Sequence, residues 1–182
     1  MRLNTIADIS QGIPLNRIRI KKGVDVKKEY VYSFEGDSQI TIPVDTENAD
    51  QHIPFTKPDM ILINLTSYKA EKIEVEDVGK IIPSNYIIIE VEDRQLVDPD
   101  YLQWHIDKSQ RFARELHKIK QGSTILSIPI NEFRRLRLKL PDIEFQKKLG
   151  RINKLQKRRE KLYEERKKLI ERLMLALDEE EY

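Results

Sequence analysis

The sequence predicts an α+β fold, with a β-rich domain over residues 1–141 and one long helix over residues 142–182. Three observations predict it. Five segments rich in β-branched and aromatic residues lie between residues 30 and 93, separated by Gly, Pro, Asn and Asp. A capped apolar stripe follows from Asp98 to Gly122, and an uninterrupted helical pattern runs from Asp142 to Leu177. At 182 residues, the chain has room for one such domain but not for a second.

The first residues predict one short helical turn, because Leu3, Ile6 and Ile9 recur at threefold spacing before a loop. The next segment, from Arg17 to Gly23, alternates basic residues with isoleucine and predicts a strand with its charges outward. Three of these charges suit contact with a phosphate: Arg19, Lys21 and Lys22. The alternative is a solvated strand edge.

The predicted strands are YVYSFEG, QITIPV, DMILINL, KIEVEDVGKII and YIIIEVED. The polar stretch TENADQHIPFTKPD, with two prolines, is predicted to be a loop. After DMILINL comes TSYKAEK, where Ser67, Tyr68 and Lys69 combine hydroxyl groups with a positive charge at a strand exit. Such side chains bond to phosphates or base edges, although an ordinary hairpin has a similar composition.

Asp98 followed by Pro99 predicts a helix start, and this helix is expected to end near Gly122. Polar residues surround that glycine, in a composition that suits approach to a phosphate: Lys118, Lys120, Gln121 and Ser123. The alternative is a glycine that simply ends the helix. The following segment, up to Pro141, predicts a loop, a strand, a short turn and a second strand.

The long helix is predicted to begin after a cap at Asp142, and Gly150 is the only weak helix former within it. Its apolar residues recur at heptad spacing, which predicts a pairing helix. The residues expected at the dimer seam are Ile152, Leu155, Arg159, Leu162, Arg166, Leu169 and Leu173. The alternative is a solvated amphipathic helix folded against its own domain.

The composition excludes several classes of protein. There is no cysteine, so a disulfide scaffold and a Cys-ligated metal are excluded. The apolar runs are too short to span a membrane, and the start of the chain does not resemble a signal peptide, so we expect a cytoplasmic protein. The chain contains 33 basic and 31 acidic residues, but Lys and Arg gather on the long helix, which favours an anionic partner.

Motifs for catalysis are missing from the sequence. Neither a GxGxxG nor a GxxxxGK[ST] motif is present, and no serine lies in GxSxG. His52, His105 and His117 lack the spacing of metal ligands. We therefore expect a binding protein without a catalytic site, a metal or a cofactor of its own.

Four segments, in this order, carry a resemblance to a known family: LNTIADISQGIPL, KPDMILINLT, VDPDYLQWHID and GSTILSIPINEFRRLRLKLPDIEFQKKLGRI. The chain resembles a specificity (S) subunit of type I restriction-modification systems, in a half-length form with one target-recognition domain and one conserved helix. In LPDIEFQ the family usually has a second proline and an acidic residue before the glutamine, here Gln146. The family's S subunits usually have two recognition domains and two helices that pair antiparallel.

The resemblance implies a non-catalytic subunit that reads one half of a bipartite target in double-stranded DNA. It implies a homodimer, or pairing with another half S subunit, and an interrupted inverted repeat as the target. The implied partners are a modification subunit, which binds S-adenosylmethionine, and a restriction subunit, which uses ATP and Mg²⁺. The alternatives are a coiled-coil interaction module without specific DNA binding, an enzyme with a novel site, and a nonfunctional truncated product.

Overall fold

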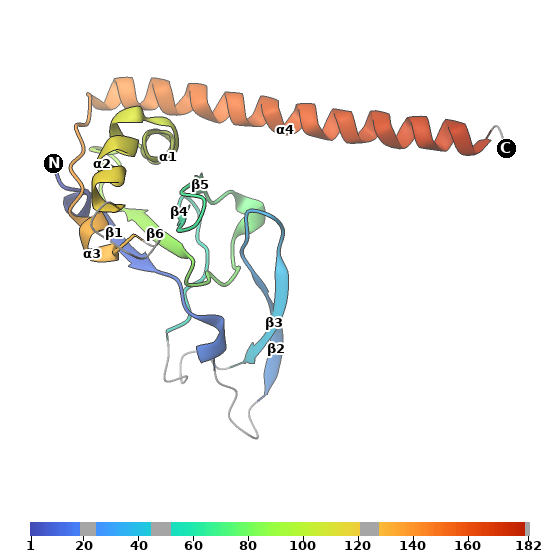
Figure 1. Cartoon of the computed structure of the whole chain (residues 1–182), viewed down its shortest axis with the longest axis horizontal. Helices are drawn as coiled ribbons and strands as arrows, with labels where there is room; N and C mark the ends of the chain where they lie inside the picture. Colours follow the sequence, from blue (N-terminus) through green and yellow to red (C-terminus); the bar gives the residue numbers. More distant parts are fainter. Residues whose placement is uncertain (19–24, 45–51, 121–127, 181–182) are drawn as a thin grey trace.

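The computed structural model describes residues 1–18, 25–44, 52–120 and 128–180 (Figure 1). It is an α+β structure, as the sequence predicts, with a β-rich body and a long helix, α4 (Ile143–Glu180). Helix α4 runs over α1 (Pro99–Lys108) at one end of the body and extends well beyond it.

The main sheet has four antiparallel strands in the order β1-β6-β4-β5. Their bounds are β1 Ala7–Gln11, β6 Tyr86–Val91, β4 Ile61–Asn64 and β5 Ala70–Lys72. The first four residues of β6 are all buried, so this central strand is covered on both faces. A separate antiparallel hairpin is formed by β2 (Val26–Val31) and β3 (Ser38–Pro43).

Helices cover one face of the main sheet. They are α1, α2 (Gln110–Lys120) and α3 (Ile130–Arg134). Alternate residues of the strands, such as Ile9, Ile63 and Ile89, form one core cluster with Leu102, Phe112 and Phe133 of these helices. The intervening residues Leu62 and Ile88 face the other side, where Tyr32 and Ile73 complete a second cluster. A smaller third cluster lies beside the β2–β3 hairpin, around Ile42 and Ile81.

The predicted helix from Asp98 to Gly122 is two helices, which corrects the sequence interpretation. Asp98 caps α1 as predicted, because its Oδ1 accepts a hydrogen bond of 2.8 Å from the backbone N–H of Tyr101. Ser109 then takes an extended conformation and separates α1 from α2. Serine is favoured at such a helix boundary, and the break lets Phe112 pack into the same core as Leu102.

Two predictions for segments near the sheet are wrong. Only Leu3–Thr5 is helical at the start of the chain, as a short 3₁₀ helix, and Ile9 lies in β1. The segment KIEVEDVGKII is not one strand, because β5 ends at Lys72 and Val75–Asp77 forms a 3₁₀ helix. Its isoleucines Ile73, Ile81 and Ile82 are buried, but Ile81 makes only isolated bridges, to Val31 and Phe55.

Two further segments also differ from prediction. Leu15–Arg17 is a 3₁₀ helix, so the predicted basic strand does not begin at Arg17. The short turn expected before Pro141 is helix α3, and the strand after it is reduced to one bridge between Arg2 and Arg137. Pro129 lies just before α3. Because proline has no backbone N–H to donate to a neighbouring strand, it limits sheet pairing at this point.

Candidate nucleic-acid interface and pairing helix

The loop that joins β4 to β5 is a hairpin turn held by hydrogen bonds. A hairpin is the alternative that the composition of TSYKAEK left open. Asn64 Oδ1 accepts hydrogen bonds from the backbone N–H groups of Thr66 (2.8 Å) and Ser67 (3.0 Å). Tyr68 is held at a positive φ of 59°, and its ring packs against the core cluster under the helices. Ser67 and Lys69 are exposed, so they are the members of the predicted trio that face solvent.

Helix α1 fixes the position of this hairpin through buried hydrogen bonds. Gln103 is 2% exposed, and its Nε2 donates to the carbonyl oxygen of Ala70 at 2.6 Å. The N–H of Ala70 donates to Asp107 Oδ1 at 3.2 Å. Both backbone polar atoms of Ala70 are therefore bonded to α1, which makes the hairpin and the helix one unit.

Helix α2 presents a basic face beside the same core. Arg111, Arg114 and Lys118 are exposed at spacings of three and four residues, while Phe112 on the opposite side is buried. Lys118, a predicted contact residue, forms an ion pair with Glu115, with 2.7 Å between Nζ and Oε1. A hydrogen bond from Lys118 lowers the pKa of Glu115, and the charges of Arg111 and Arg114 act in the same direction. The face therefore has more positive than negative charge.

Arg111 and Arg114 are not among the contacts predicted from the sequence, because that prediction concerned the end of the helix and the loop after it. The signal was present in the spacing of RFARELHK. Several predicted contacts lie outside the described residues, namely Arg19, Lys21, Lys22, Gln121 and Ser123. Lys120 is the last residue of α2, and its side chain also lies outside the description. Of the predicted DNA contacts, Ser67, Tyr68 and Lys69 lie in the β4–β5 hairpin and Lys118 lies on α2, and both of these elements contribute residues to one core cluster.

The start of α4 packs closely on α1. Asp142 caps α4 as predicted, accepting a hydrogen bond of 2.9 Å from the N–H of Phe145. Gln146 is 1% exposed and bonds to the backbone of Leu96, Asp98 and Pro141. Gly150 lies so close to α1 that an added Cβ would be 2.8 Å from the backbone nitrogen of Tyr101.

Polar contacts continue the packing of α4 on α1 further along α4. Asn153 Nδ2 donates to Gln103 Oε1 at 2.8 Å, which connects α4 through α1 to the β4–β5 hairpin. Burial lowers the pKa of Lys157, although the negative charge of Glu71 opposes this shift. Burial likewise raises the pKa of Glu71, although the charge of Lys157 opposes it. Both shifts favour the neutral forms, so desolvation outweighs the attraction of the pair.

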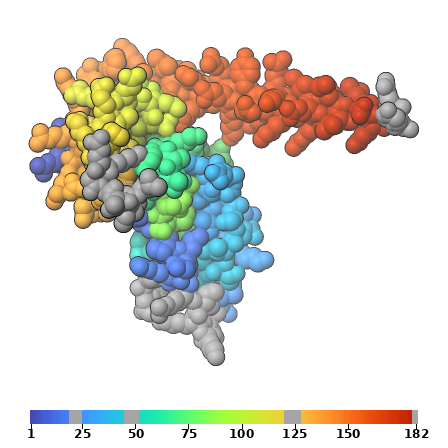
Figure 2. Space-filling view, viewed as in Figure 1, coloured from blue at the N-terminus to red at the C-terminus, as the bar shows by residue number. Residues whose placement is uncertain are grey.

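The opposite side of α4 carries the predicted seam residues, and they are exposed. Every described side chain from Arg158 to Glu179 is exposed, and Figure 2 shows the far end of α4 standing clear of the body. The apolar members of the predicted seam are between 54% and 62% exposed: Ile152, Leu155, Leu162, Leu169 and Leu173. Phe145, seven residues before Ile152, is 51% exposed and extends the same column.

The body therefore does not cover the leucine stripe, and the alternative of a helix folded against its own domain is wrong for this face. At about 100° per residue, the body-facing residues Gln146, Gly150, Asn153 and Lys157 lie on the side of α4 opposite Leu155 and Leu162. Arg159 and Arg166 are exposed within the stripe.

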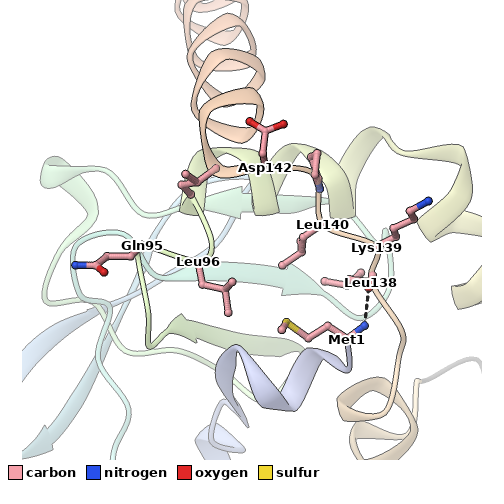
Figure 3. A pocket seen from close by; sticks show the side chains of 9 residues that line it. Met1, Gln95, Leu96, Leu138, Lys139, Leu140 and Asp142 are labelled. Carbon is pink, nitrogen blue, oxygen red and sulfur yellow. Dashed lines mark hydrogen bonds between the residues drawn. The ribbon is translucent and has the colours of Figure 1, made fainter.

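Two hollows lie away from these surfaces. One, of about 540 Å³, lies at the base of α4 and is lined mainly by apolar residues such as Leu96, Leu138 and Leu140 (Figure 3). The other, of about 610 Å³, lies beside β1 and β6, where Lys57 and Glu90 form an ion pair of 3.2 Å. Among the described residues, no cluster of His, Asp and Glu is placed to hold a metal ion. None of the described helices combines the length and apolar character needed to cross a lipid bilayer.

The sequence matches no protein-family profile and no curated protein. Solved structures do match. A chain from a structure on complex assembly and conformational transition of the type I restriction-modification system has a TM-score of 0.59 and 14% identity. The match covers 89% of this chain and 43% of that chain.

Two further solved structures are S subunits. The type I restriction-modification S subunit from M. genitalium has a TM-score of 0.57 and 13% identity, covering 91% of this chain and 40% of that one. The HsdS subunit from Thermoanaerobacter tengcongensis has a TM-score of 0.53 and 12% identity, covering 87% and 37%. This chain spans about two fifths of the length of the chains it matches. It has the fold of type I S subunits, which confirms the predicted resemblance at the level of fold.

Proposed function

We propose that this chain is a non-catalytic DNA sequence-recognition subunit of a type I restriction-modification complex. The observation that carries the proposal is the fold, which matches S-subunit chains over 87% to 91% of this chain. Residues 1–141 form the recognition domain and read one half of a bipartite target. Residues 142–182 contain the helix that pairs with another chain.

The DNA surface includes the β4–β5 hairpin and the basic face of α2. The exposed charges of Arg111, Arg114 and Lys118 suit the phosphates of a duplex, which make affinity depend on salt. Ser67 and Lys69 stand on a hairpin whose backbone is fixed by hydrogen bonds, as base-reading side chains require. The predicted contacts Arg19, Lys21, Lys22, Lys120, Gln121 and Ser123 remain part of the proposal.

The complex supplies the chemistry in this proposal. A modification subunit binds S-adenosylmethionine and methylates DNA, and a restriction subunit uses ATP with Mg²⁺. The present chain places both on their target and holds no cofactor itself. Its surface for pairing is the stripe of α4, whose apolar side chains are more than half exposed: Ile152, Leu155, Leu162, Leu169 and Leu173.

The test compares DNA affinity across salt concentrations. A variant with Arg111→Gln, Arg114→Gln and Lys118→Gln is titrated with a fluorescent random-sequence duplex by anisotropy. The slope of log affinity against log salt should become shallower by about 0.9 for each phosphate that the variant no longer neutralises. The control variant, Lys154→Gln, Lys167→Gln and Lys168→Gln, removes the same charge from exposed positions of α4 and should keep the slope of the natural chain.

The second candidate function is a coiled-coil interaction module without specific DNA binding. It is favoured by the leucine stripe, which needs a partner whether or not DNA is bound. If both triple variants change the salt slope of DNA affinity equally, the DNA surface lies elsewhere. If the natural chain shows no salt-dependent affinity for DNA, the interaction module is the better description.

A further inference from the structure

We propose that the partner of α4 is a second copy of this chain, bound antiparallel in a register that places Ile152 of each copy opposite Leu169 of the other. The resemblance already implies a second copy and an antiparallel pair, so what this inference adds to the proposed pairing role of α4, on which it rests, is the register. The surface is the face of α4 turned away from the body, whose two heptad columns begin at Phe145 and Lys148.

The direction follows from the distribution of charge along α4. The half from Ile143 to Lys161 contains eight basic and two acidic residues. The half from Leu162 to Glu180 contains four basic and six acidic residues. A parallel pair would place the two strongly basic halves side by side. An antiparallel pair places each basic half beside an acidic half and also opposes the helix dipoles.

The two columns are complementary to each other when the helices run antiparallel. In such a pair, residues of one column pack against residues of the other column in the second copy. One register matches all five members of each column: Phe145 with Ala176, Lys148 with Leu173, Ile152 with Leu169, Leu155 with Arg166, and Arg159 with Leu162. It pairs the largest side chain of the stripe, Phe145, with the smallest, Ala176.

This register also accommodates the arginines within the stripe. Arg159 and Arg166 each face a leucine, so their methylene stems pack on apolar surface while the guanidinium groups reach solvent. Beside this layer, Arg158 of one copy lies near Glu165 of the other. Arg151 lies near Arg172 on the same flank, where both side chains are exposed and their repulsion is screened.

Shifting the helices by one heptad gives poorer matches. A shift in one direction places Lys148 opposite Arg166 and leaves Leu173 without a partner. A shift in the other direction leaves Phe145, which is 51% exposed in the single chain, without a partner. The chosen register is self-complementary about a twofold axis, so each pairing occurs twice and the assembly closes as a dimer.

Disulfide trapping tests the register, because the natural chain contains no cysteine. A chain with Ile152→Cys and Leu169→Cys should become a covalent dimer on oxidation, seen on a non-reducing gel. Chains with either substitution alone should stay unlinked, because residues 152 of the two copies lie about 25 Å apart along the pair. A parallel pair would give the reverse result for the single variants and would overturn the proposal.

Further variants test the exact layer and guard against misfolding. Ile152→Cys with Leu162→Cys, or with Ala176→Cys, reports a shift of one heptad, and efficient linking of either would overturn the register. Ile152→Cys with Leu175→Cys is a control off the stripe and should not link. Phe145→Cys with Ala176→Cys is an independent second pair, which should link. All of these side chains are exposed in the single chain, so the body should fold normally.

The molar mass of the natural chain tests pairing by α4 separately from the register. A monomer at micromolar concentration would contradict pairing by α4 and the register with it. A dimer that links through other positions would overturn only the register and leave the proposed function intact. A dimer linked through Ile152 and Leu169 supports both.

Discussion

Gly150 lies where α4 crosses α1, and its missing side chain lets the two helix backbones approach. A Cβ at this position would lie 2.6 Å from Asp98 Oδ1 and 2.8 Å from the backbone nitrogen of Tyr101. These atoms form the capped first turn of α1, which has little freedom to move. From sequence alone, Gly150 was only a weak helix former, because its close neighbour lies about fifty residues earlier in the chain.

Gly150→Ala should therefore destabilise the protein, although alanine is the better helix former by about 1 kcal/mol. Overpacking typically costs about 1–3 kcal/mol, so after the gain in helix propensity we expect a net loss of up to about 2 kcal/mol in the free energy of unfolding, measured with urea. Gln156→Ala, at an exposed position of the same helix, should change it by less than about 0.5 kcal/mol. A more stable Gly150→Ala variant would mean that α1 and α4 cross less closely.

His105 makes stability depend on pH. It is 6% exposed, stacks on Tyr101 and lies 3.4 Å from that hydroxyl group. Burial lowers its pKa, and the positive charge of Arg111 adds to this shift. The unfolded chain therefore binds a proton more readily than the folded chain does, so stability should rise as pH increases up to about 6.5.

The measurement is the urea midpoint at several values between pH 5 and pH 7.5. His105→Leu removes the titrating group and should flatten the curve over this range, even if it lowers stability throughout. His52→Gln changes an exposed histidine and should leave the curve as in the natural chain. An unchanged pH dependence in His105→Leu would assign it to other groups.

At the scale of elements, α4 uses two opposite faces. The heptad columns were predictable, because leucine and isoleucine recur at three and four residues. The face on the body was not, because Gln146, Gly150, Asn153 and Lys157 are not an apolar pattern. They fit only because α1 supplies Gln103 and a close backbone, and β5 supplies Glu71.

Other elements show the same limit of sequence reasoning. Strands β3, β4 and β6 were predicted, since their β-branched residues form continuous runs. The break at Ser109 was not predicted, although six residues separate Ile106 from Phe112 and this gap interrupts the helical spacing of three and four. Val75 fits a strand pattern but is 83% exposed in a 3₁₀ helix.

Leu162→Asp with Leu169→Asp should prevent pairing of α4 while leaving the body folded. Both side chains are exposed in the single chain, so only the paired state would bury the new charges. We expect a monomer by light scattering, with an unchanged thermal transition of the body. Leu175→Asp places a charge on an equally exposed leucine outside the stripe and should still pair. Dimers that survive the double change would contradict the use of this face.

At the scale of the whole molecule, the body is fixed to one end of α4. The contacts run from the hydrogen bonds of Gln146 with Leu96 and Asp98 to the ion pair of Lys161 with Glu76, at 3.3 Å. Beyond it, α4 extends past the body (Figure 1). The sequence predicted this division, because heptads continue far beyond what one small domain can cover. The basic face of α2 was not predicted, although the spacing of Arg111, Arg114 and Lys118 indicates it.

The assembly proposed here should be visible as a change of mass. The natural chain should have a molar mass near twice 21.6 kDa, which grows when a random duplex is added at low salt and again with a cognate modification subunit. The Leu162→Asp and Leu169→Asp variant should show about half the starting mass. A natural chain whose mass responds to neither addition would contradict the proposed function.

The exposed second half of α4 also has an energetic consequence. Residues 162–179 are all exposed, so within one chain this segment depends largely on its own backbone hydrogen bonds. An isolated helix of this length is marginally stable in water, because nucleation is unfavourable and few side chains are buried. Association of two chains would bury the stripe and stabilise the helix at the same time. Folding of this segment and dimerisation are then one linked equilibrium, and dilution should lower the helix content along with the mass.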